Sequence, residues 1–147
     1  MNIVSPETVR LQATAQDKQD AIRQAGELLA QGGCVDPAYV QGMLARERTM
    51  STYLGNGVAI PHGQHEDLGL VRRTGISVLQ LPQGVEWEPG ERAYLVIGIA
   101  ASSDEHVGVL ANLAEVVEDP EAAEQLAHTT DPMQIIERLN RTSTEEV

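Results

Sequence analysis

The sequence contains few aromatic and few sulfur-containing residues. Among 147 residues there is no Phe, one Trp and one Cys, and aromatic residues make up 3% of the chain. A buried core must therefore be built from Val, Ile, Leu and Ala, and the hydrophobic fraction of 41% is enough for a single domain of this length. Because Cys34 is alone, an internal disulfide is excluded, and we expect a small, partly buried thiol in a reducing compartment.

Cationic side chains are also scarce. Lys and Arg total 10 against 22 Asp and Glu, which gives a formal net charge of −12. This balance argues against non-specific binding to nucleic acid and against docking on anionic lipid, since both need a basic surface. A macromolecular partner would present a basic patch, although an acidic surface that only keeps the protein in solution explains the charge equally well.

Long hydrophobic runs and known nucleotide motifs are missing. The longest apolar stretch, AYLVIGIAA at residues 93–101, is too short to cross a bilayer, and the first ten residues show no signal-peptide pattern. We therefore expect a cytoplasmic protein without membrane insertion. There is no phosphate-binding P-loop, dinucleotide fingerprint or nucleophile elbow, so a protein that handles phosphate here must receive it already activated, without a bound cofactor.

Helical and extended patterns alternate along the chain. We expect strands over residues 9–13, 58–60, 75–81 and 93–101, with turn signals in the segment PQGVEWEPGE between the last two. We expect helices capped by Asp17 and Asp36, a third that starts at Ser102 with capping-box spacing, a short one at residues 121–128 set apart by Asp119-Pro120, and a last one that starts at Asp131-Pro132. The tail over residues 141–147 should be frayed. The pattern predicts an α/β domain in which helices pack on a mixed sheet.

Two of the four histidines follow predicted strands. His62 comes after the strand at 58–60, where Pro61 stiffens the approach and Gly63 allows the backbone to come close to another group. From these local features alone, a reactive histidine and a loop-capping histidine are equally plausible. His106 falls in the first turn of the helix that follows the strand at 93–101, and the carboxyl ends of strands are where open α/β sheets place their sites. An exposed first-turn residue is the alternative for His106.

Other candidate residues carry weaker signals. His65 forms an H-x-x-H pair with His62, but Pro61 and Gly63 disfavour a helix there and no third ligand is fixed by spacing, so a metal site is a minor alternative. His128, at the end of a predicted helix, is better explained as a favourable cation at that terminus. Arg46, near the end of another helix, could clamp phosphoryl oxygens or simply lie on the surface.

The segment LGNGVAIPHG at residues 54–63, preceded by Glu47, resembles a known phosphorylation-site signature. It is similar to that of the enzyme IIA domains of the mannitol/fructose class in the bacterial phosphoenolpyruvate-dependent sugar phosphotransferase system. The resemblance extends over nearly the whole chain, and stretches such as LVIGIAASSDEHVG and QLAHTT fit the mannitol type better than its nitrogen-regulatory relative.

The resemblance implies a site and a reaction. It implies that His62 is phosphorylated and that His106 and Arg46 stabilise the phosphoryl group. It also implies phospho-HPr as donor, a cysteine of enzyme IIB as acceptor, and uptake of mannitol or a related sugar, with no metal or cofactor. Asn56 stands where some mannitol-type proteins carry an acidic residue, so the role of that position is open.

Pattern and resemblance together give the expected architecture, one expected function and two alternatives to it. We expect one enzyme IIA domain over residues 1–147, an α/β sandwich with a mixed, mostly five-stranded sheet flanked by helices on both faces. The expected function is that of a phosphotransferase acting through phosphohistidine. The alternative is a regulatory module whose phosphorylation state controls a partner protein, and a metallohydrolase built on His62 and His65 is weaker.

Overall fold

The sheet has five strands in the order β1-β4-β5-β3-β2. The computed structural model describes residues 3–101 and 103–144, without the side chains of residues 103–107, 110, 112 and 141–144. The strands are β1 (Val9–Arg10), β2 (Tyr53–Gly55), β3 (Val58–Ala59), β4 (Gly75–Glu88) and β5 (Glu91–Ala100). β1 runs parallel to β4 and β3 parallel to β5, whereas the β4–β5 and β2–β3 pairs are antiparallel. The expected mixed, five-stranded sheet is confirmed.

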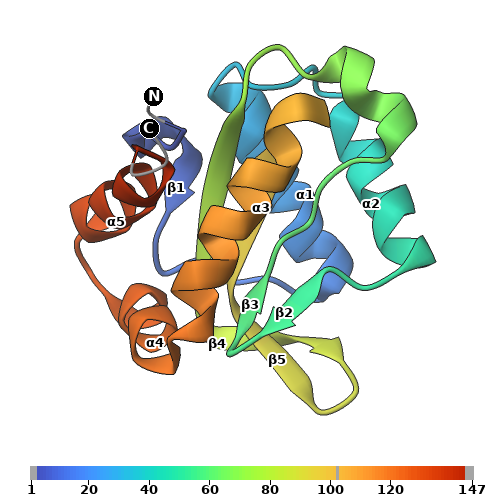
Figure 1. Cartoon of the computed structure of the whole chain (residues 1–147). Helices are drawn as coiled ribbons and strands as arrows, with labels where there is room; N and C mark the ends of the chain where they lie inside the picture. The colour runs from blue at the N-terminus through green and yellow to red at the C-terminus, as the bar shows by residue number, and fades with distance from the viewer. Residues whose placement is uncertain (1–2, 102, 145–147) are drawn as a thin grey trace.

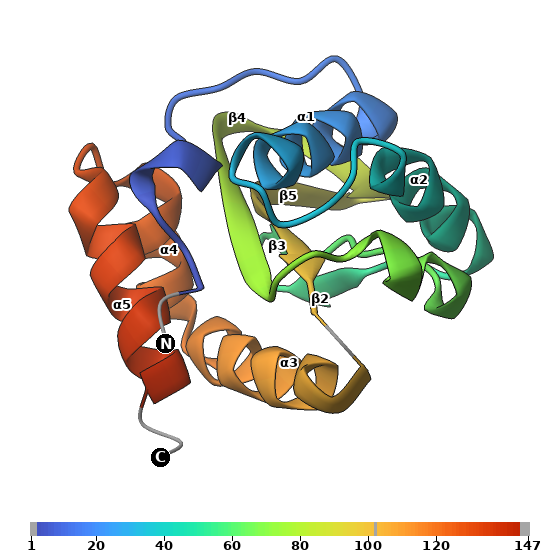
Figure 2. The same ribbon diagram turned by 90° about the horizontal axis from the view of Figure 1, so that it is seen from above.

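Helices cover both faces of this sheet. The α-helices are α1 (Lys18–Gln31), α2 (Tyr39–Thr49), α3 (Ser103–Glu118), α4 (Pro120–His128) and α5 (Pro132–Thr144). Figure 2 shows α1 and α2 on one side of the sheet and α3 on the other, with α4 and α5 beside β1. Figure 1 shows β1 beside α5.

The core consists of two apolar clusters, one on each side of the sheet. Along β5, Leu95, Ile97 and Ile99 belong to the cluster under α3, α4 and α5, whereas Val96 and Ala100 belong to the cluster under α1 and α2. This alternation follows from the period of two in a strand, and burial on both faces explains the continuous apolar sequence of β5. Aliphatic side chains and Ala dominate both clusters, as the composition predicts.

The start of α1 agrees with its sequence signal, whereas that of α2 does not. The Asp17 carboxylate accepts from the backbone N–H of Asp20, so Asp17 is the N-cap of α1 as predicted. The prediction that Asp36 caps α2 is wrong, because α2 begins at Tyr39. Asp36 accepts instead from the Ala38 N–H, and this bond lowers the pKa of its carboxyl group; the residues between them form a turn that leads into the helix.

Strand β4 is longer than predicted. The turn signals predict a connection after residue 81, but β4 continues to Glu88 and turns only around Gly90. Pairing with β5 outweighs the local turn signals, because a register shift between Gln80 and Val85 absorbs Pro82 and the positive φ of Gly84. The structure also adds the short strand β2, which we did not predict.

The C-terminal helix is tied to the N-terminal segment. The Asn140 side chain accepts from the backbone N–H groups of Ile3 and Val4 and donates to the Val4 carbonyl. The α5 backbone is helical to Thr144, within the segment that we expected to be frayed.

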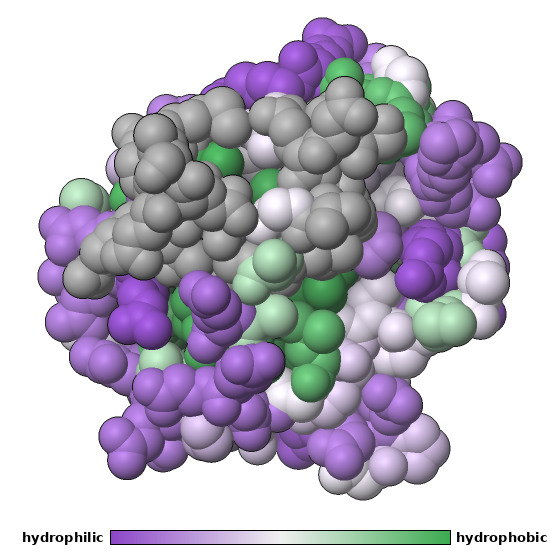
Figure 3. Space-filling model, viewed as in Figure 1, coloured by the Kyte–Doolittle hydropathy of each residue, from purple (hydrophilic) through white to green (hydrophobic). Residues whose placement is uncertain are grey.

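In the described part of the chain, no helix is both long and apolar enough to cross a membrane. Figure 3 shows hydrophilic side chains over α4 and along the lower edge of the molecule.

Candidate active site

His62 lies where the chain leaves the sheet after β3. The register of β3 against β5 continues beyond Ala59, since the Ile99 N–H donates to the Pro61 carbonyl at 3.0 Å and His62 forms a parallel bridge with Ile99. Pro61 has no N–H to give to a ladder, which is tolerated where a strand ends. His62 is therefore held at the carboxyl end of β3, beside the end of β5, and its residue is half-buried.

One hydrogen bond sets the tautomer of His62. Its Nδ1 lies 2.9 Å from the carbonyl oxygen of Ile60. A carbonyl oxygen can only accept, so Nδ1 carries the proton and the lone pair of the neutral ring is on Nε2. In the neutral ring, Nε2 is therefore the nitrogen that is left with a lone pair.

Tyr39 contacts the chain directly after His62, and sequence reasoning missed it. Its buried hydroxyl accepts from the Gly63 N–H at 2.9 Å and donates to the Ile99 carbonyl at 2.9 Å. A Cβ on Gly63 would lie 2.6 Å from the Tyr39 ring, so the close approach that we expected at Gly63 is made by Tyr39, within the domain. Burial raises the pKa of the Tyr39 phenol, which keeps the hydroxyl protonated.

Arg46 lies on the same face of α2, two turns beyond Tyr39. Between them, Gly42 and Met43 also face inward, and a Cβ on Gly42 would clash with the Asp67 carboxylate of the 3-10 turn η2 (His65–Leu70). The Arg46 guanidinium donates through Nη1 to the Met50 carbonyl at 2.7 Å. This bond satisfies a carbonyl at the end of α2 and fixes the guanidinium at that end of the helix.

Topology brings His106 to the same edge of the sheet as His62. Strands β3 and β5 are parallel neighbours, so their carboxyl ends coincide, and α3 begins three residues after β5 ends. The backbone of His106 is in the first turn of α3, as predicted. The His106 side chain and Ser102, the predicted cap of α3, lie outside the described part of the structure.

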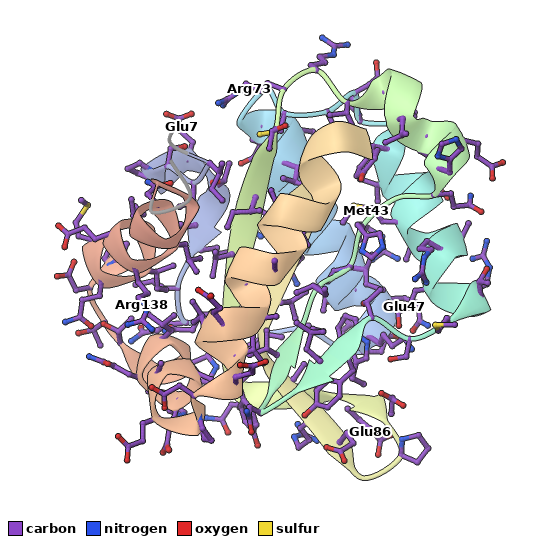
Figure 4. All side chains as sticks on the ribbon, viewed as in Figure 1. Glu7, Met43, Glu47, Arg73, Glu86 and Arg138 are labelled. Carbon is purple, nitrogen blue, oxygen red and sulfur yellow. The ribbon has the colours of Figure 1, made fainter. Side chains whose placement is uncertain are left out.

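A buried carboxylate ties α2 to the strand that leads into the site. Glu47 is 6% exposed and accepts from the backbone N–H of Thr52 at 3.0 Å, from the Thr52 hydroxyl at 2.5 Å and from Trp87 Nε1 at 3.1 Å. Lys18 adds an ion pair at 3.3 Å and lies 5.6 Å from the centre of the Trp87 ring. Figure 4 shows Glu47 at the lower end of α2, one turn below Met43.

Thr52 in turn fixes the backbone of Ile60, two residues before His62. Its carbonyl accepts from the Ile60 N–H at 3.0 Å, and the Ile60 carbonyl is the acceptor for His62 Nδ1. The sequence marks Glu47 only as the first residue of the signature, because Lys18 and Trp87 are distant from it in the chain and leave no local pattern.

Asn56 has a structural role in the turn between β2 and β3. It adopts a positive φ of 52°, which Asn tolerates better than most residues, and its Nδ2 donates to the Val117 carbonyl near the end of α3 at 2.6 Å. A carboxylate could not make this bond. The amide group of Asn56 therefore gives this position a structural contact with α3.

The remaining candidates lie apart from His62 or lack a ligand set. His65 starts η2 and is exposed, and His128 packs its ring against Tyr94 at 6.3 Å at the end of α4. No group of three or more His, Cys, Asp and Glu residues capable of holding a metal occurs among the described residues. Cys34 is buried, more completely than expected, and burial raises its thiol pKa.

The sequence matches a known protein family over nearly its whole length. Residues 2–142 match the family model described as "Phosphoenolpyruvate-dependent sugar phosphotransferase system, EIIA 2". A "Multiphosphoryl transfer protein" from Xanthomonas campestris pv. campestris is 54% identical over 92% of this chain. The "Mannitol-specific phosphotransferase enzyme IIA component" of Bacillus subtilis is 37% identical over 95% of this chain and 98% of its own length.

A solved structure shares both fold and sequence. It is the complex of mannitol enzyme IIA and phosphorylated mannitol enzyme IIB from Escherichia coli, with a TM-score of 0.87, 43% identity, and coverage of 92% of this chain and 96% of that one. The multiphosphoryl transfer proteins are much longer, since the present chain spans only 16% of the length of the Xanthomonas protein. By its sequence over residues 2–142, this chain belongs to the EIIA 2 family of the phosphoenolpyruvate-dependent sugar phosphotransferase system.

Proposed function

We propose that this domain is a phosphotransferase that carries a phosphoryl group on Nε2 of His62. The observation that carries the proposal is the hydrogen bond between Nδ1 and the Ile60 carbonyl, which leaves the lone pair on Nε2. A neutral imidazole in this tautomer is a ready nucleophile near neutral pH. A loop-capping histidine makes the same kind of bond, so the two interpretations are separated by whether His62 takes up the phosphoryl group.

In the first step, the Nε2 lone pair attacks the phosphorus of a phosphohistidine on HPr. A new N–P bond forms, the N–P bond to the donor imidazole breaks, and its electron pair returns to the donor ring. In the second step, the thiolate of an enzyme IIB cysteine forms an S–P bond, and the pair of the Nε2–P bond returns to His62. Neither transfer needs a metal or a nucleotide.

In the transition state, the negative charge of the transferred phosphoryl group is spread over three oxygens and must be stabilised. We assign this task to Arg46 and His106, helped by the positive N-terminal end of α3 at the same edge of the sheet. Arg46→Ala and His106→Ala should each slow transfer by at least about tenfold while some phosphorylation remains. Arg48→Ala is the matched control, since Arg48 lies exposed on the same helix.

The partners and the sugar are part of the proposal. The net charge of −12 favours donors and acceptors with basic docking surfaces. The relationship to mannitol-specific enzyme IIA supports uptake of mannitol or a related sugar, with HPr before this domain and enzyme IIB after it. A cytoplasmic location is proposed with them, and the lone buried thiol of Cys34 supports it.

The test is label transfer in a reconstituted chain of labelled phosphoenolpyruvate, enzyme I and HPr. The wild-type protein should take up label, His62→Ala should take up none, and His128→Ala should match the wild type because His128 lies at the end of α4. Label on the His62→Ala variant would contradict the assignment.

Onward transfer separates this proposal from its alternative. A carrier passes the label to a cysteine of a cognate enzyme IIB, whereas a purely regulatory module retains it under the same conditions. If the protein is phosphorylated on His62 but keeps the label in the presence of every enzyme IIB tested, the regulatory module is favoured.

A further inference from the structure

The hydroxyl of Tyr39 lies at the point where the sheet ladder ends beside His62. In a parallel ladder that pairs His62 with Ile99, the Ile99 N–H bonds to residue 61 and the Ile99 carbonyl accepts from residue 63. The first bond is present at 3.0 Å. At the second position the Tyr39 hydroxyl joins the two groups, accepting from Gly63 and donating to Ile99, each at 2.9 Å.

His62 is consequently held from both sides along the chain. On its N-terminal side, the Pro61 carbonyl is bound by Ile99; on its C-terminal side, the Gly63 N–H is bound by Tyr39. The Tyr39 ring is itself fixed, since Tyr39 is 3% exposed and its ring lies against the Cα of Gly63. The helix that carries it packs tightly on α1, where a Cβ on Gly26 would lie 2.7 Å from Val40.

We propose that Tyr39 is a positioning residue for His62: its hydroxyl sets the backbone after His62 and thereby the direction of the imidazole. This role rests on the proposed phosphoryl transfer. In-line transfer depends on the placement of the attacking nitrogen, and a displacement of about 1 Å is enough to cost on the order of a hundredfold in rate. Without the hydroxyl, the Gly63 N–H would have to move toward the Ile99 carbonyl to regain a partner, and His62 would move with it.

Tyr39→Phe tests the proposal, because it removes the hydroxyl and keeps the ring. Tyr53→Phe is a matched control. The Tyr53 hydroxyl likewise accepts from a glycine N–H, that of Gly57, and donates to a backbone carbonyl, that of Arg92, but it does so in the β2–β3 hairpin rather than beside His62. Both substitutions remove the same kind of bridge.

The measurements are kcat and KM for phosphoryl uptake from phospho-HPr, and the ¹⁵N shifts of the His62 imidazole in the unphosphorylated protein. We expect Tyr39→Phe to lower kcat by about tenfold or more, to leave KM within about twofold, and to shift the Nδ1 and Nε2 resonances. Tyr53→Phe should leave kcat and both resonances as in the wild type.

Two results would overturn the proposal: a folded Tyr39→Phe protein with wild-type kcat and unchanged imidazole resonances, or an equal loss of kcat in Tyr53→Phe. If Tyr39→Phe does not fold, Gly63→Ala decides, since its methyl group presses on the Tyr39 ring and should displace His62 and lower kcat. If wild-type protein takes up no label, the proposed function fails, while the imidazole spectra still test the positioning role independently.

Discussion

The histidine at the centre of this domain depends on a carboxylate that lies several bonds away. Glu47 holds Thr52, Thr52 holds Ile60, and the Ile60 carbonyl selects the tautomer of His62. Each link in this series is a hydrogen bond between identified atoms. A residue without contact to the His62 ring therefore helps to fix the carbonyl that binds Nδ1.

We predict that Glu47→Ala destabilises the fold by about 3–5 kcal/mol. The substitution leaves the Lys18 ammonium, the Trp87 N–H and the Thr52 donors without their shared acceptor. Urea unfolding followed by circular dichroism gives the free energy. Glu86→Ala is the control, because Glu86 is exposed on β4 and should change stability by less than about 0.5 kcal/mol. Equal stability of the two variants would show that the buried network contributes little.

At the scale of elements, the candidate site lies at the ends of β3 and β5, where α2, the β2–β3 hairpin and α3 are held together. Tyr39 fastens α2 to the edge of the sheet, and Asn56 fastens the hairpin to the end of α3. The positive φ of Asn56 and the donor at its side chain are both needed at this turn.

Asn56→Asp should therefore destabilise the protein by about 1 kcal/mol or more. A carboxylate would face the Val117 carbonyl at the negative end of α3, replacing a hydrogen bond by repulsion. Asn56→Gly keeps the backbone conformation and loses only the bond, so its loss in unfolding free energy should be smaller. Thermal and urea unfolding of both variants check this order, and an Asn56→Asp variant as stable as the wild type would contradict it.

Local signals predicted some elements and failed at others for a physical reason. The Asp17 cap, the apolar face of α1 and the continuous apolar run of β5 depend on near neighbours or on simple burial, and all three are present. The extension of β4 to Glu88 depends on pairing with β5, which overrides the turn residues Pro82 and Gly84.

The candidate site was likewise predictable only where its residues carry a local sequence signal. His62 and the backbone position of His106 were predictable because both follow strands. The contacts of Tyr39 and Glu47 with Ile99 and Trp87 join segments far apart in the chain, so neither role has a local pattern. Asn56 could not be interpreted without α3, since its partner is the Val117 carbonyl.

For the whole molecule, two buried groups that become anions on losing a proton contribute to the response to alkaline pH. Burial raises the pKa of the Cys34 thiol and of the Tyr39 phenol, because the folded interior disfavours their anions. The unfolded chain loses these protons at lower pH than the folded protein. The stability that they contribute is fully present below the unfolded pKa values and is lost as pH rises through the folded ones.

We accordingly predict that the free energy of unfolding falls from about pH 9 upward, with each group contributing at most about 1.4 kcal/mol per pH unit. Urea unfolding from about pH 7 to about pH 11 measures the slope. Cys34→Ala removes one of the groups and should flatten the first part of the decline, whatever its effect near neutral pH. A Cys34→Ala protein with the wild-type slope between about pH 9 and about pH 10 would show that the thiol does not contribute.

The central claim is that Nε2 of His62 carries the phosphoryl group. Phosphorylating ¹⁵N-histidine-labelled protein with phosphoenolpyruvate, enzyme I and HPr, and then recording ¹⁵N–³¹P couplings, tests it directly. We expect one phosphorus coupled to Nε2 of His62, with Nδ1 still protonated against the Ile60 carbonyl. Coupling to Nδ1, or to a ring nitrogen of another histidine, would contradict the account.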